Sequence, residues 1–266
     1  MRFDIEFFNL GYIDRLAYKN TFIHRLDARV KVLITLIYII LVVSFPKYEI
    51  VQLVPFFLFP VVFITLGEIP VNFLIKRVLI VSGFVFFIAI FNPILDRKVA
   101  FYFLNIPISY GFISFFSIFI KFFLTISFLF LLVATTSFSG ICYALRYFKV
   151  PEIFVNQLLF LYRYIFVLAE ETMRMVRAKD IRSFGKNGND IKIFVKLTGN
   201  LLIKSIERAE RIYYAMLSRG FNGIMPYLRK KKIDIYDIVF FLVSILVLVF
   251  FRMFNIPELI EILVRG

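Results

Sequence analysis

The stretch "FISFFSIFIKFFLTISFLFLLVATTSF" (Phe112–Phe138) decides the fold, because it is the longest of five apolar runs in the chain. A helix needs about 17–25 predominantly apolar residues to cross the hydrocarbon core of a bilayer. This run exceeds that length with a single charge, Lys121, so it predicts a long membrane helix. A charge at that depth is costly. Lys121 is therefore expected either to face a partner or a wet cavity, or to snorkel towards the interface.

The other apolar runs extend this prediction along the 266 residues. The chain is 61% hydrophobic, well above a soluble globular domain, which indicates lipid-facing surface. We predict an all-α, polytopic membrane protein with about five transmembrane helices. Proline disfavours helical geometry in the residue before it, so Asn92-Pro93 should end the third helix. Asp96–Gly111 then predicts an external hairpin or loop. The other runs are Val30–Phe45, Ile50–Leu66, Val78–Leu95 and Ile235–Phe251.

The positive charge of the chain indicates its orientation in the membrane. The net charge is +14, and Ala169–Lys232 alone carries fifteen Lys and Arg residues against six Asp and Glu. In a soluble protein this balance would suggest nucleic acid, but in a membrane protein positive loops lie on the cytoplasmic side. We therefore predict no nucleic-acid partner. The N-terminus, which is also basic, and the basic tract should both face the cytoplasm.

The residues that usually carry catalysis or metal binding are scarce. The chain has one cysteine, Cys142, so no internal disulfide can form, and one histidine, His24. A transition-metal site within this chain would lack its usual imidazole and thiolate ligands. No phosphate-binding G-x-x-x-x-G-K-[ST] loop is present. We predict no cofactor, no metal site and no catalytic residue, with His24 structural or interfacial.

Two long amphipathic helices are predicted in the basic tract, at Glu152–Phe184 and Ile191–Phe221. The link between them, Gly185–Asp190 ("GKNGND"), is rich in turn formers. Neither helix looks apolar enough to span a bilayer. The predicted organisation is a membrane region (1–151) with about four transmembrane helices, a cytoplasmic helical hairpin (152–232), and a last transmembrane helix with a tail (233–266).

The two predicted hairpin helices repeat a pattern. A shift of 37 residues aligns a Glu-Arg-Ala-Arg series in one helix with the same series in the other, each residue four positions after the last. Such spacing places the side chains on one helix stripe, with Glu preceding Arg in the favourable order. The stripes are Glu170, Arg174, Ala178 and Arg182 in the first helix, and Glu207, Arg211, Ala215 and Arg219 in the second.

The end of each stripe has both a plain and a functional interpretation. An Arg close to a following Gly is a common helix terminator, because a cation suits the helix dipole and Gly suits the stop. The chain has such a Gly after both stripes, Gly185 and Gly220. Two matched copies favour a second interpretation, in which Arg182 and Arg219 are equivalent docking points for a partner with two similar halves.

The chain resembles the transmembrane T component of energy-coupling-factor (ECF) transporters, in the CbiQ branch. The resemblance covers "HRLDARVKV" (His24–Val32), "LYRYIFVLAEETMRMVRAKDIRS" (Leu161–Ser183) and "IERAERIYYAMLSRGFNG" (Ile206–Gly223), the last being the most specific. In that family each coupling helix ends in a three-residue motif centred on Arg. The motif falls here on Ile181-Arg182-Ser183, which departs from the family by having Ile in place of a small residue, and on Ser218-Arg219-Gly220.

The resemblance implies a non-catalytic scaffold in a prokaryotic cell membrane. It implies as partners two ATPase subunits (A component, CbiO-like) and a substrate-binding membrane subunit (S component, CbiM-like), with cobalt or nickel as cargo. A vitamin-type cargo is the alternative within the family. Outside the family, a scaffold that binds anionic lipid through its basic tract is an alternative. A membrane enzyme acting on lipid is disfavoured, because each candidate carboxylate lies within reach of an Arg in its own helix.

Overall fold

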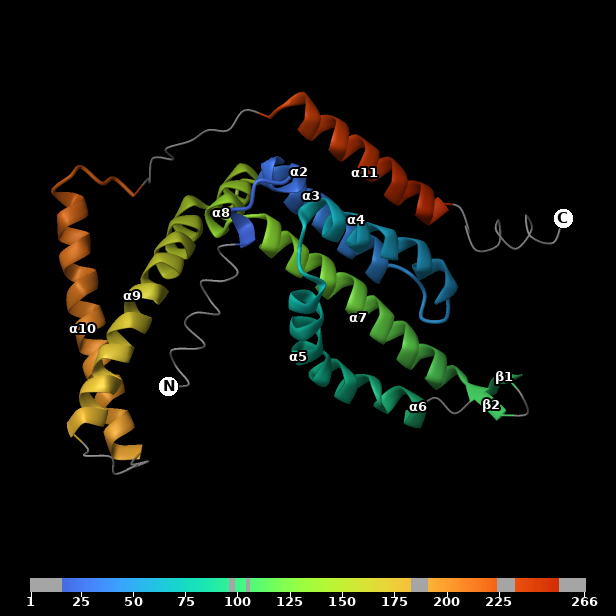
Figure 1. The fold of residues 1–266 in the computed structure, drawn as a ribbon, viewed down its shortest axis with the longest axis horizontal. Coiled ribbons are helices and arrows are strands. Elements are labelled where there is room, and N and C mark those ends of the chain that lie inside the picture. Colours follow the sequence, from blue (N-terminus) through green and yellow to red (C-terminus); the bar gives the residue numbers. More distant parts are fainter. Residues whose placement is uncertain (1–15, 96–98, 104–105, 183–190, 224–232, 254–266) are drawn as a thin grey trace. The chain divides into compact units, whose positions relative to one another are not determined.

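The computed structural model describes residues 16–95, 99–103, 106–182, 191–223 and 233–253 (Figure 1). The chain divides into two compact units, which we call the core unit and the hairpin unit. The hairpin unit contains α8 (Phe138–Tyr147), α9 (Glu152–Arg182) and α10 (Ile191–Leu217). The core unit contains α2 (Phe22–Arg25), α3 (Ala28–Val43), η1 (Val51–Phe57), α4 (Leu58–Gly67), α5 (Val71–Ala89), α6 (Phe91–Leu95), β1 (Val99–Phe103), β2 (Ile106–Ser109), α7 (Tyr110–Thr135) and α11 (Ile235–Met253).

The predicted helical membrane fold is confirmed, with one short antiparallel hairpin of β1 and β2 where an external hairpin or loop was expected. Four helical segments are long and apolar enough to cross a bilayer: Val71–Ile94, Tyr110–Thr135, Glu152–Arg182 and Ile235–Met253. The first two apolar runs form shorter helices, because α3 has only 16 residues and Val51–Gly67 combines a 3-10 helix with α4.

The presence of α9 in this group corrects one expectation. Neither hairpin helix was expected to be apolar enough to span, yet α9 reaches that threshold. Its first half carries exposed large apolar side chains, including Ile153, Phe154 and Leu161, while its second half carries most of its charge. Averaging over all 31 residues of α9 hides this division between an apolar and a charged half.

Two predicted helix ends are also wrong. The regular helix α5 ends at Ala89, before Asn92-Pro93, and both of those residues lie inside α6. Proline is tolerated there because it is the third residue of α6, where its missing N–H has no intrahelical partner to lose. The predicted helix to Phe221 ends at Leu217.

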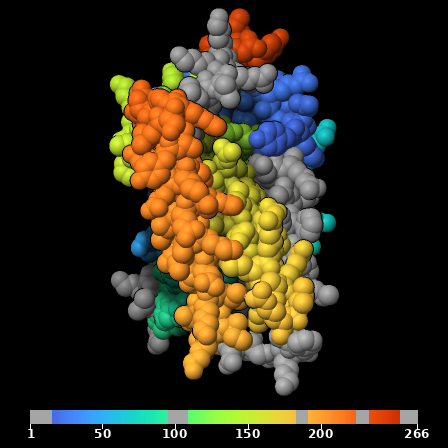
Figure 2. All heavy atoms as spheres, turned by 90° about the vertical axis from the view of Figure 1, so that its left-hand side faces the viewer, coloured from blue at the N-terminus to red at the C-terminus, as the bar shows by residue number. Residues whose placement is uncertain are grey.

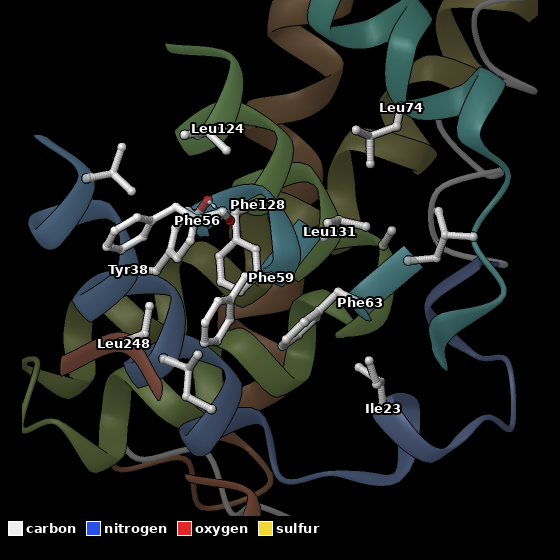
Figure 3. Packing of buried hydrophobic residues seen from close by; sticks show 14 of the residues in the cluster. Ile23, Tyr38, Phe56, Phe59, Phe63, Leu74, Leu124, Phe128, Leu131 and Leu248 are labelled. Carbon is white, nitrogen blue, oxygen red and sulfur yellow. Dashed lines mark hydrogen bonds between the residues drawn. The ribbon is translucent and has the colours of Figure 1, made fainter. Parts of the chain in front are cut away.

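An aromatic cluster holds the centre of the core unit together. Tyr38 of α3 is fully buried, and its hydroxyl donates a hydrogen bond of 3.1 Å to the carbonyl of Phe56. The Tyr38 ring lies 4.3 Å from that of Phe128 in α7 and 5.8 Å from that of Phe59 in α4, measured between centroids (Figure 3). Leu248 brings α11 into the same cluster. The short helix α3 is therefore the element around which the longer helices pack.

A buried polar network joins the start of α3 to the start of α11. The Asp27 carboxylate caps α3 by accepting the Arg29 backbone N–H at 2.8 Å, and it forms an ion pair with the Arg29 guanidinium at 2.9 Å. The Asp27 backbone N–H donates to Oδ1 of Asp237 at 2.7 Å. Lys31 Nζ donates to the carbonyl of Thr135 at the end of α7, also at 2.7 Å. Buried charges need such partners, so the network fixes which helix ends meet.

Candidate functional site

The helices α9 and α10 carry every residue that the sequence predicts as a coupling site. A turn through Lys149, whose φ is +62°, leads from α8 to Pro151, and α9 begins at the next residue. Arg146 of α8 forms an ion pair with Glu152 in the first turn of α9. The ring of Tyr162 stacks on that of Phe138 at 4.3 Å between centroids, which braces α9 against α8.

Two contacts show that α9 and α10 run antiparallel. Glu171 of α9 accepts a hydrogen bond of 2.7 Å from Nζ of Lys204 of α10. Nearer the start of α9, Nδ2 of Asn156 donates to the carbonyl of Gly223 at 2.9 Å. Moving backwards along α9 therefore corresponds to moving forwards along α10. The two helices lie together on the face shown in Figure 2, with α10 in orange and α9 in yellow.

The antiparallel pairing places the two predicted arginines at opposite ends of the hairpin. Arg182 is the last residue of α9, which has 31 residues and is therefore about 45 Å long at 1.5 Å per residue. Arg219 follows α10, on the side where Gly223 meets the first turns of α9. Both side chains are exposed. The repeat in the sequence thus becomes two exposed cations separated by most of the length of the hairpin.

The second motif, Ser218-Arg219-Gly220, is a well-formed helix end. Gly220 has a φ of +78°, its N–H bonds the carbonyl of Leu217 at 2.9 Å, and the N–H of Phe221 bonds that of Met216 at 3.0 Å. This is the Schellman pattern, in which a residue with left-handed geometry closes the last turn. Arg219 is the residue before the closing glycine, so the chain leaves the helix axis there and the guanidinium lies in solvent.

Less of the first motif can be compared. Ile181 and Arg182 are both exposed at the end of α9, Ile181 with 78% of its surface accessible. Ser183 and Gly185 lie outside the described residues. An Ile exposed to this degree at a helix end is an apolar contact surface beside the Arg, where the second motif has the small polar residue Ser218.

The two predicted stripes differ in their contacts although their sequences match. In α9, NH2 of Arg174 forms an ion pair of 2.6 Å with Oε1 of Glu170, as the spacing predicts, and Ala178 is exposed. In α10, Glu207 and Arg211 form no such pair within the part of the chain that the structure describes. Arg211 and Ala215 instead line a hollow between the helices together with Tyr164 and Val167 of α9.

A crevice of about 520 Å³ lies between the first half of α9 and the second half of α10. Its lining is mainly apolar and aromatic, with Arg208 as its charged member; Arg208 also lines the neighbouring hollow around Arg211. The sequence analysis missed this feature and the residues that frame it, although an apolar residue every three or four positions on both helices signals it. The lining comprises Gln157, Phe160, Leu161, Tyr164, Ile165, Val167, Leu168, Ser205, Arg208, Ala209, Ile212, Tyr213 and Met216.

Comparison with known proteins gives a consistent family. The family model described as "Cobalt transport protein" (CbiQ) matches residues 19–232. An uncharacterized protein of Methanocaldococcus jannaschii is 30% identical over 88% of this chain and 82% of its own length. The energy-coupling factor transporter transmembrane protein EcfT of Streptococcus equi subsp. equi is 30% identical over 77% of this chain and 81% of its own. The nickel permease LarQ of Lactiplantibacillus plantarum is 28% identical over a shorter segment, 34% of this chain and 33% of its own.

The match includes the polar network at the start of α3, the aromatic cluster and both hairpin helices. Together with the four helices that are long and apolar enough to span, it identifies a multi-pass membrane component of a transporter. The chain belongs to the cobalt transport protein family CbiQ, the T components of energy-coupling-factor transporters.

Proposed function

We propose that this T component couples ATP hydrolysis by two separate ATPase subunits to the uptake of cobalt or nickel through a separate substrate-binding membrane subunit. In this role the chain itself is not a catalyst. The observation that carries the proposal is the position of Arg182 and Arg219, both exposed, at opposite ends of an antiparallel helix pair.

The spacing of these two arginines suits a partner with two similar halves. A pair of identical or related ATPases presents two equivalent grooves, and one helix end would enter each. Arginine suits such a contact because its guanidinium stays charged and donates bidentate hydrogen bonds to carboxylates or carbonyls. The Schellman turn at Gly220 helps, because it ends α10 beside Arg219 and leaves the side chain clear of the helix.

The hairpin also offers a way to transmit movement. Lys204–Glu171 and Asn156–Gly223 tie α10 to α9, so a shift imposed on Arg219 would be passed to the first turns of α9. The first half of α9 presents exposed apolar side chains and, with α10, the crevice. We infer that the substrate-binding subunit contacts this apolar part of the hairpin, while the ATPases contact the charged helix ends.

The orientation and the cargo follow from the same proposal. The basic tract would face the cytoplasm, where ATP is available, in agreement with the distribution of Lys and Arg. The name of the family model refers to cobalt and that of the Lactiplantibacillus relative to nickel, and both metals are retained as the proposed cargo of this transporter. The ion would be bound by the substrate subunit, and this chain would supply the mechanical link.

Reconstitution with both partners tests the proposal. The complex of this chain, two ATPase subunits and a substrate-binding subunit would be purified and placed in liposomes, and uptake of radiolabelled cobalt and nickel would be measured with ATP inside or outside. Reversing both charges, with Arg182→Glu and Arg219→Glu, should reduce ATPase retention and ATP-driven uptake at least tenfold. Lys192→Glu with Lys196→Glu is the matched control, because both lysines are exposed on α10. Full assembly and uptake in the Arg182/Arg219 variant would disprove the coupling role.

A further inference from the structure

Two cations converge on the C-terminal end of α3 in the core unit. Nζ of Lys121, from the middle of α7, donates a hydrogen bond of 2.5 Å to the carbonyl of Phe45 and one of 3.4 Å to that of Pro46. The guanidinium carbon of Arg252, near the end of α11, lies 4.2 Å from the centroid of the Phe45 ring. NH2 of the same arginine is 3.5 Å from Oγ of Ser44. Three elements thus meet at Ser44–Pro46.

These contacts explain part of the position of Lys121, but they leave positive charge in excess. The carbonyls at a helix C-terminus carry roughly half a negative charge, whereas Lys121 and Arg252 bring two full positive charges. Their acceptors are backbone carbonyls, a hydroxyl and an aromatic ring, all of them neutral. Among the described residues no carboxylate lies within ion-pair distance of either cation. An anion from outside the chain would offset this excess.

The surroundings favour an amphipathic anion over a small soluble one. Arg252 is the penultimate residue of the 19-residue helix α11, which places it at one boundary of the membrane. One turn back from the site, Ile40 lies four residues before Ser44, and Val249 lies three residues before Arg252, so each shares a helix face with its polar neighbour. Both side chains are exposed, at 65% and 43%. Apolar surface for an acyl chain therefore adjoins the cations on the side of the membrane interior.

We propose that Lys121 and Arg252 form a binding site for the phosphate group of an anionic lipid. Lys121 supplies a point charge with donors, and the planar guanidinium of Arg252, oriented by stacking on Phe45, supplies further N–H donors. The starts of α3 and α11 meet at Asp27 and Asp237, so the site lies at the other end of these two helices. If the start of α3 is cytoplasmic, as the proposed function requires, the lipid belongs to the outer leaflet.

Lipid binding by the purified full chain in detergent tests this site. Native mass spectrometry would compare phosphatidylglycerol, phosphatidylcholine and inorganic phosphate as probes, and thermal unfolding would be followed with each. We expect phosphatidylglycerol to be retained and to raise the Tm, because a ligand that binds only the folded state stabilises it. The double variant Lys121→Gln with Arg252→Gln should retain at least fivefold less. Lys47→Gln with Lys76→Gln, which removes the same charge at exposed positions, should stay within twofold of the parent.

Each outcome decides the matter. Equal phosphatidylglycerol binding by the two double variants, or equal binding of phosphatidylcholine by the parent, overturns the proposal. Inorganic phosphate that binds and displaces the lipid at millimolar concentration keeps the phosphate chemistry but makes a free anion the occupant. Lys121 also holds carbonyls of α3, so if its variant does not fold, Arg252→Gln alone is measured and must still lose binding. Because the assay needs no ATPase, its failure leaves the proposed coupling role unaffected.

Discussion

Asn156 and Gly223 are 67 residues apart, yet Nδ2 of Asn156 donates a hydrogen bond of 2.9 Å to the carbonyl of Gly223. This bond places the end of α10 beside the start of α9 and so determines where Arg219 stands. Asn156 is 92% buried, with a relative exposed surface of 8%. Its donor therefore has little water available as a substitute, and a side chain that cannot donate leaves the Gly223 carbonyl without this partner.

Removing this bond should loosen the second motif and leave the first unchanged. Asn156→Ala is expected to cost about 1 kcal/mol, the usual net value of one hydrogen bond. Hydrogen exchange of the backbone amides at 218–223 should accelerate severalfold, while exchange in the last turns of α9 should not change. Gln157→Ala, at the exposed neighbouring position, is the control. Equal acceleration in both variants would show that the Asn156 side chain does not hold the α10 end.

Two glycines of α10 and its terminal turn should respond in opposite directions to alanine. Gly220 has a φ of +78°, where a Cβ is strained, so Gly220→Ala should destabilise the turn by about 1 kcal/mol. Gly199 lies inside α10 with open space around its Cα, so Gly199→Ala should stabilise the helix by roughly 0.5–1 kcal/mol. Local hydrogen exchange along α10 measures both. A stabilising effect of Gly220→Ala would contradict the Schellman closure.

Lysine substitution separates groove docking from lipid attraction. Lysine keeps the charge of arginine but not its planar, bidentate donors. In the Arg182→Lys and Arg219→Lys variant we expect ATPase retention and ATP-driven uptake to fall at least fivefold, with binding to anionic vesicles unchanged. If the same variant assembles and transports like the parent, the hairpin recognises charge alone, as a scaffold for anionic lipid would.

The Asp27 network should be a major source of stability in the core unit. Asp27→Ala removes the partner of Arg29, which is itself buried, so it should cost roughly 3–5 kcal/mol, the range for breaking one side of a buried ion pair. The Tm of the purified protein in detergent measures the loss. Glu49→Gln, at an exposed position, is the control and should leave the Tm within one degree or so. A small effect of Asp27→Ala would mean that water reaches Arg29.

His24 should make stability depend on pH below neutrality. Burial, and to a lesser extent the charge of Lys31, lower the pKa of His24 from its ordinary value of 6.5. The unfolded state then binds more protons than the folded state, so stability is full above pH 6.5 and falls as pH drops towards the folded pKa. Thermal unfolding at pH 7.5 and pH 5 should show a larger loss for the parent than for His24→Gln. Identical losses would refute a buried neutral His24.

Much of the hairpin was predictable because its signals are local. The pattern of apolar and charged positions predicted both helices, and the first ion pair of the stripe, Glu170–Arg174, followed from its four-residue spacing. The end of α10 was placed four residues late, since the Arg-Gly pair does not reveal on which residue the helix closes. The equivalent pair Glu207–Arg211 did not form, because Arg211 lines the hollow between the helices.

The amino-acid sequence by itself determined that this is a helical membrane protein with a basic hairpin and two arginine-tipped helix ends. Composition, hydrophobic period and charge are properties of consecutive residues, so they can be read without knowing what each helix touches. Only the tertiary structure decided that the two arginines lie at opposite ends of the hairpin, that Asp27 meets Asp237, and that Lys121 and Arg252 converge on Ser44–Pro46. Those pairings depend on how faces of distant helices fit and on where buried charges find partners, and no local pattern encodes that choice.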